Sequence, residues 1–232
     1  MFIGNFYFLG ADSTILLHHT IITNRKFAAK LFGQHNDCMR NRHSVIYVPG
    51  LGDEHDRGQS LALKLWNFYG LKAECFRIGW AGNTPFDEKL KKLHSRVKAL
   101  SQVGTVSLVG ASAGATAVIN EFSFGQNDIH RMVCIAGKLK NFDTITDQTY
   151  AHNPNFRRSI ELVPESLQKL SDTDRGNILT LVPASDNIVP VQDAVIDGVE
   201  SREIPVQGHA FAIGYALTIG SKLIADFLNN KY

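Results

Sequence analysis

One serine in the chain has the local sequence that a catalytic nucleophile needs. Residues 110–114 read Gly-Ala-Ser-Ala-Gly, which is the pattern Gly-x-Ser-x-Gly centred on Ser112. An apolar, β-branched run precedes it over 103–109, and a helix-like run rich in small residues follows it over 113–122. These runs predict a strand, a tight turn and a helix, which together expose the serine hydroxyl and direct the first helical N–H groups toward it. The residue types indicate nucleophilic attack by a serine; the alternative is a glycine-rich turn with a solvated serine.

Strand-like and helix-like segments alternate along the rest of the chain. Strands are predicted at 44–48, 71–78, 103–109, 129–136, 177–182 and 200–206. Helices are predicted at 59–69, 85–100, 113–122 and 217–228. This alternation predicts an α/β fold, with a mostly parallel twisted sheet and helices on both of its faces.

Two of the predicted helices have informative detail. The first has Leu61, Leu65 and Phe68 on one face and is closed by Gly70. The second has Thr84 in position to cap it and Pro85 in its first turn. Its apolar residues recur at helical spacing and predict one buried stripe: Phe86, Leu90, Leu93, Val97 and Leu100. The Lys and Arg residues between them are interpreted as a solvated face, not as a nucleic-acid site.

Two stretches are less regular. Residues 1–43 are expected to form an N-terminal extension, a β-hairpin at the sheet edge followed by a short helix, and a signal peptide is the disfavoured alternative. Residues 138–175 form the longest irregular stretch, partly helical over 156–170 and broken at Pro164. We interpret this stretch as a small lid or no lid at all, within a single domain over 1–232.

Four segments that could do chemistry follow predicted strands. Ser112 follows one strand, Asp186 the next to last and His209 the last, and a glycine-rich loop at 49–53 follows the first confident strand. Ligands of parallel sheets bind at the carboxyl ends of the strands. We therefore expect these four segments to converge on one edge, although they are far apart in the sequence.

In this arrangement the chain resembles the α/β-hydrolase superfamily over roughly residues 44–228. The serine turn resembles its nucleophile elbow, the Asp-Asn-Ile-Val-Pro segment at 186–190 its acid segment, and Gly-His-Ala-Phe at 208–211 its histidine segment. The order Ser, Asp, His matches the superfamily. One departure is Pro49-Gly50, where many members have His-Gly.

The resemblance implies a role for each residue. Ser112 would be the nucleophile, His209 the base and then the acid, and Asp186 the group that orients His209. The backbone N–H groups of Leu51 and Ala113 would bind the oxyanion. The alternatives weighed for the histidine and the acid are His55, His94, His152, Asp172, Asp174 and Asp193. Asp53 and Asp56 are interpreted as loop and cap residues, and Trp80 and Phe211 as pocket lining or core.

The composition limits the class of protein. The 232 residues are 44% hydrophobic and 20% charged with a net charge of +2, which fits one globular domain and gives no strong field toward nucleic acid or an anionic membrane. No apolar run is long enough to span a bilayer. Cys38, Cys75 and Cys134 are widely spaced and are expected to be reduced, which favours the cytoplasm. No cluster has metal-ligand spacing and no loop has the lysine of a phosphate cradle, so we expect neither metal nor cofactor.

The resulting prediction is a serine hydrolase that cleaves a small-molecule carboxylic ester through an acyl-enzyme on Ser112. The alternatives are a thioesterase or amidase with the same triad, and a hydrolase-fold ligand-binding or sensor protein with little turnover. Acyl and alcohol specificity and oligomeric state stay open.

Overall fold

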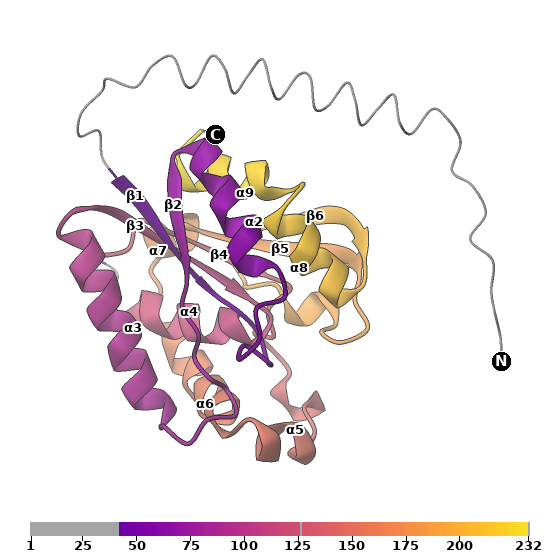
Figure 1. Ribbon diagram of the computed structural model, residues 1–232. Helices are drawn as coiled ribbons and strands as arrows, with labels where there is room; N and C mark the ends of the chain where they lie inside the picture. Colours follow the sequence, from indigo (N-terminus) through magenta and orange to yellow (C-terminus); the bar gives the residue numbers. More distant parts are fainter. Residues whose placement is uncertain (1–41, 126, 232) are drawn as a thin grey trace, which may run out of the picture. The chain divides into compact units, whose positions relative to one another are not determined.

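Six parallel strands form the central sheet of the structure, a computed structural model in which residues 42–125 and 127–231 are described (Figure 1). The strands are β1 (Arg42–Val48), β2 (Leu71–Cys75), β3 (Gly104–Ala111), β4 (Arg131–Ile135), β5 (Ile178–Ser185) and β6 (Glu200–Gln207). Their order across the sheet is β2-β1-β3-β4-β5-β6, and every pair is parallel. The predicted α/β fold is confirmed. Of the N-terminal extension expected over 1–43, residues 1–41 lie outside the described residues, and with them the expected hairpin and short helix.

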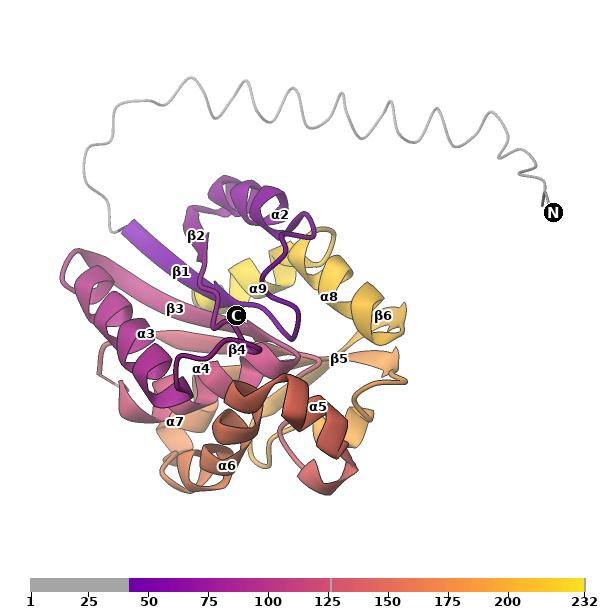
Figure 2. The ribbon, with the colours of Figure 1, turned by 60° about the horizontal axis from the view of Figure 1, so that its bottom comes forward.

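Helices cover both faces of this sheet, as Figure 2 shows. The helices are α2 (Gln59–Leu65), α3 (Phe86–Ser101), α4 (Ala113–Phe124), α5 (Asp147–His152), α6 (Pro154–Gln168), α7 (Asp172–Gly176), α8 (His209–Leu217) and α9 (Ser221–Leu228). Short 3₁₀ helices are η1 (Trp66–Tyr69), η2 (Phe142–Thr144) and η3 (Val191–Asp193). Helices α3, α4 and α6 pack on one face, and α2, α8 and α9 pack on the other.

Alternation along the strands explains why both faces are covered. In β1, Ile46 and Val48 belong to the core under α3, α4 and α6, whereas Val45 and Tyr47 belong to the core under α2, α8 and α9. Successive side chains of a strand point to opposite faces, so a continuous apolar run requires a layer of helices on each side. No single helix of the described residues combines the length and apolar composition needed to cross a membrane; α8 and α9 meet that test only when the two helices, bent by 60°, are counted together.

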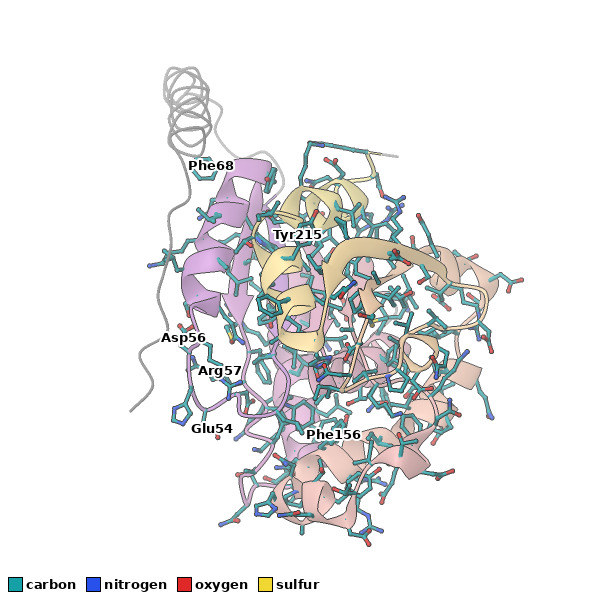
Figure 3. The ribbon with its side chains drawn as sticks, turned by 90° about the vertical axis from the view of Figure 1, so that its right-hand side faces the viewer. Glu54, Asp56, Arg57, Phe68, Phe156 and Tyr215 are labelled. Carbon is teal, nitrogen blue, oxygen red and sulfur yellow. The ribbon has the colours of Figure 1, made fainter. Side chains whose placement is uncertain are left out.

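The apolar face predicted on the first helix points outward. Leu61, Leu65 and Phe68 are 69%, 43% and 59% exposed, and Figure 3 shows Phe68 at the outer side of its segment. The neighbouring stripe of Ala62, Leu63 and Trp66 is buried instead, and the indole N–H of Trp66 donates to the Leu217 carbonyl at 3.0 Å. The predicted helix is present as α2 followed by η1, and the apolar face seen in the sequence is not the face that packs on the sheet.

Three predicted helix boundaries also have outcomes. Gly70 closes η1 in the left-handed conformation at φ 77°, as expected. Thr84 does not cap α3: Pro85 is the residue before the helix, with extended backbone, and no side chain caps the end. Helix α6 is not broken at Pro164 but runs through it. Pro164 is exposed, so water can satisfy the carbonyl that the proline ring leaves without a partner.

Residues 138–175 contain more regular structure than the sequence suggested. Helix α6 packs directly on α4, where the Thr116 and Ser159 hydroxyls lie 2.6 Å apart and Asn120 donates to the Ser159 carbonyl at 2.9 Å. These groups are buried, so α6 is part of the helical layer. A lid within 138–175 stays a prediction.

Candidate active site

Ser112 is the single residue between β3 and α4. Its φ of 52° and ψ of −121° fall outside the favourable regions for a residue with a side chain. Its backbone N–H donates to the Ile135 carbonyl on the neighbouring strand at 2.9 Å, which fixes the turn to the sheet. The strain holds the side chain out of the strand and helix on either side of it.

Close approach of the backbone explains the small residues around this turn. A Cβ atom on Gly110 would lie 2.6 Å from the Gly114 carbonyl oxygen, and one on Gly50 would lie 2.8 Å from the Ser112 Cβ. A Cβ on Gly114 would overlap the carbonyl oxygen of Val48 at the end of β1. The glycines therefore allow the start of α4 and the loop after β1 to meet at the serine.

The structure brings Ser112, His209 and Asp186 into one hydrogen-bonded chain. The Ser112 Oγ lies 2.8 Å from His209 Nε2, and His209 Nδ1 lies 2.8 Å from Asp186 Oδ2. The side chain of Asp186 is 1% exposed and that of His209 is 13% exposed. A carboxylate can only accept, so His209 donates from Nδ1 and leaves Nε2 free to accept the serine proton.

The second oxygen of Asp186 is fixed by its own loop. Asp186 Oδ1 accepts the backbone N–H groups of Ile188 at 2.8 Å and Val189 at 3.0 Å. Only Oδ2 is thus directed at His209. Asp186 directly follows β5, which ends at Ser185. The Ser185 carbonyl accepts the N–H of Gly208, the residue before His209, at 2.7 Å. This bond joins the segments that carry the acid and the histidine.

The other histidines and acids considered from the sequence lie elsewhere. His94 contacts Glu121 and His152 contacts the Gln148 carbonyl, while His55 is exposed. Asp193 is buried against Lys138 Nζ at 2.6 Å, Asp174 closes a capping box on α7 with Ser171, and Asp172 is exposed. None of these contacts involves Ser112.

The glycine-rich loop after β1 lies against the serine and is held by a clamp that the sequence did not predict. The Asp53 carboxylate accepts the N–H groups of Gly79 at 2.7 Å and Trp80 at 3.3 Å. The indole N–H of Trp80 donates to the Pro49 carbonyl at 3.1 Å. Asp53 is 2% exposed, unlike its neighbours Glu54, Asp56 and Arg57, which are exposed on the same loop (Figure 3).

This clamp holds the loop at Pro49 and Asp53, on either side of Gly50 and Leu51. A Cβ on Gly50 would lie 3.3 Å from the Ser112 Oγ, so the loop passes beside the hydroxyl. Trp80 is fully buried between Phe86 and Phe156, at ring-centroid distances of 6.1 and 5.9 Å. The partners of Asp53 are 26 and 27 residues away, so no local pattern in the sequence marks this role.

Metal ligands and thiols are the other kinds of side chain that could do chemistry. Among the described residues, no group of three or more His, Cys, Asp and Glu side chains is placed to hold a metal ion. Cys75 and Cys134 are free thiols, and burial raises the pKa of the Cys134 thiol to about 12. Cys38 lies outside the described part of the chain.

Solved structures share this fold. The chain is similar to one of the metagenome-derived lipolytic enzymes LipS and LipT, with 12% identity and a TM-score of 0.60, over 82% of this chain and 94% of that one. It is also similar to Est1E from Butyrivibrio proteoclasticus, with 12% identity and a TM-score of 0.59, over 84% and 90%. A third is the esterase domain of a Rhodothermus marinus protein, with 12% identity and a TM-score of 0.59, over 82% and 89%. No family model and no curated protein matches the sequence. The chain has the α/β-hydrolase fold.

Proposed function

We propose that this protein is a serine hydrolase that cleaves carboxylic esters. The observation that carries the proposal is the chain of two 2.8 Å contacts from Ser112 through His209 to Asp186, with Ser112 on a strained strand-to-helix turn. The same layout serves acyl transfer in unrelated serine hydrolases. The fold shared with lipolytic enzymes and esterases adds support at the level of the scaffold.

The acylation step follows from the hydrogen bonds. Ser112 Oγ attacks the carbonyl carbon of the ester while its proton passes to His209 Nε2. The carbonyl π electrons move to the oxygen, and the N–H groups of Leu51 and Ala113 stabilise the resulting negative charge. The C–O bond to the alcohol then breaks, and the departing alkoxide takes the proton from Nε2.

Deacylation repeats this sequence with water. His209 Nε2 takes a proton from a water molecule as the oxygen attacks the acyl carbon. The second oxyanion intermediate collapses, the bond to Ser112 Oγ breaks, and the proton returns to the serine as the acid leaves. Asp186 holds the tautomer of His209 and stabilises its positive charge in both steps. The cytoplasmic location stays a prediction.

The test is pre-steady-state hydrolysis of p-nitrophenyl acetate by the full chain. We expect a burst of p-nitrophenolate close to one equivalent per protein, abolished by Ser112→Ala and retained by Ser95→Ala, an exposed serine on α3. Equal turnover by Ser112→Ala would overturn the proposal. Fluorophosphonate labelling without ester turnover would favour the ligand-binding alternative.

A further inference from the structure

An open cup of about 610 Å³ lies beside His209. Its walls come from two segments, the loop that carries Asp186 after β5 and the turn from β6 into α8. Ser112 is not among the residues that line it. The cup therefore lies on the His209 side of the candidate site.

Two large apolar side chains line this cup and are exposed to solvent. Ile188 is 65% exposed and Phe211 is 75% exposed. The Ile188 N–H is one of the two that bind Asp186 Oδ1, and the Phe211 ring lies 3.6 Å from where a Cβ on Gly208 would be. Both side chains are thus carried by the backbone that positions the acid and the base. Exposed apolar surface at a fixed position favours binding of an apolar group.

The cup offers little to a charged ligand. Among the described residues that line it, Asp186 and His209 are the only acidic or basic side chains, and they bind each other. Within the described part of the chain, the cup has no lysine or arginine to bind a phosphate group and no free carboxylate to bind an amine. The remaining walls are glycine, alanine and uncharged polar side chains.

The chemistry of the proposed reaction decides which part of the ester faces this cup. In acylation the bond between the carbonyl carbon and the alcohol oxygen breaks, and that oxygen takes its proton from His209 Nε2. The leaving oxygen must then lie within hydrogen-bonding distance of Nε2, so its substituent extends on the His209 side. The acyl group stays on Ser112.

We propose that the cup beside His209 binds the alcohol part of the substrate, and that Phe211 and Ile188 select esters of uncharged, apolar alcohols. This inference rests on the proposed ester hydrolysis.

The experiment uses two esters with the same acyl group and alcohols of similar acidity, benzyl acetate and 2-methoxyethyl acetate. Phe211→Ala should lower the ratio of kcat/KM for benzyl acetate to that for 2-methoxyethyl acetate about tenfold, because the benzyl group loses its apolar partner. Ile188→Ala should lower the ratio about threefold. Phe124→Ala is the matched control, since Phe124 is 66% exposed at the far end of α4.

A fluorophosphonate with a fluoride leaving group separates this inference from the proposed function. Fluoride does not fill the cup, so Phe211→Ala should be labelled at Ser112 within about twofold of the wild-type rate. A ratio unchanged by Phe211→Ala, or a change instead between methyl acetate and methyl hexanoate, would overturn the alcohol site while ester hydrolysis stands. No turnover of any ester by the wild type would overturn both.

Discussion

Replacing Asp186 by asparagine tests how the acid controls the histidine. Asp186 Oδ1 accepts two backbone N–H groups, from Ile188 and Val189, at 2.8 and 3.0 Å. In Asp186→Asn the amide oxygen must occupy this position, because an amide NH₂ there would face two donors and leave them unpaired, at about 1–3 kcal/mol each. The Asn NH₂ is then directed at His209 Nδ1.

The tautomer of the histidine is inverted as a result. Nδ1 must become the acceptor from the Asn amide, so the proton moves to Nε2, the nitrogen that lies 2.8 Å from the Ser112 Oγ. A protonated Nε2 cannot take the serine proton. In a triad with this geometry the wrong tautomer costs about 10⁴-fold in kcat, or about 5.5 kcal/mol of transition-state stabilisation.

The assay is steady-state hydrolysis of p-nitrophenyl acetate near neutral pH. Asp197→Asn, which changes an exposed acid bound to Lys140, is the control and should keep wild-type kcat within about twofold. The two nitrogens of His209 are distinguishable by ¹⁵N NMR, which should report Nδ1–H in the wild type and Nε2–H in Asp186→Asn. A kcat for Asp186→Asn within tenfold of the wild type, or an unchanged tautomer, would refute this reasoning.

Three further substitutions have expected outcomes. Gly114→Ala should give no stable folded protein by urea unfolding, because its Cβ would overlap the Val48 carbonyl oxygen; a cooperative transition near that of the wild type would contradict this. Trp80→Phe keeps the buried ring but removes the donor to the Pro49 carbonyl, so kcat should fall about tenfold with KM within about twofold, and equal changes in both would argue against a loop-positioning role. Burial raises the pKa of the Glu121 carboxyl to about 7 from an ordinary 4.5, because the folded protein favours the neutral acid. This contribution to the free energy of unfolding is complete below the pKa of the unfolded chain, about 4.5, and is lost as the pH rises to about 7. Glu121→Gln should therefore gain about 3 kcal/mol over the wild type between about pH 4 and pH 8 in urea unfolding, and a pH-independent difference would contradict the shift.

Much of the fold could be predicted because its signals are local. A strand buried on both faces has a continuous apolar sequence, and the runs that include Val45 and Val106 show it. The turn at Ser112 could be placed because only small residues fit where α4 meets the end of β1. Parallel topology then placed Asp186 and His209 at the same edge, each just past a strand.

The features that the sequence did not reveal depend on contacts between distant residues. Helical periodicity allows either of two stripes on α2 and η1 to face the sheet. The stripe that does so contacts residues far along the chain, such as Leu217, whose carbonyl accepts the Trp66 indole N–H from 151 residues away. The clamp of Asp53 on Gly79 and Trp80 has no spacing rule that could announce it. A proline ends or kinks most helices, but Pro164 lies on the exposed side of α6, and this helix continues through it.

Trapping the acyl-enzyme tests the central proposal most directly. The full chain is mixed with p-nitrophenyl acetate, quenched in acid during the burst and analysed by intact-mass and peptide mass spectrometry. We expect the mass of one acetyl group on the peptide that contains Ser112, absent from Ser112→Ala and accumulating no faster than p-nitrophenolate appears. Hydrolysis with no acetyl adduct on wild-type Ser112, or an adduct on another residue that turns over at the same rate, would contradict the account.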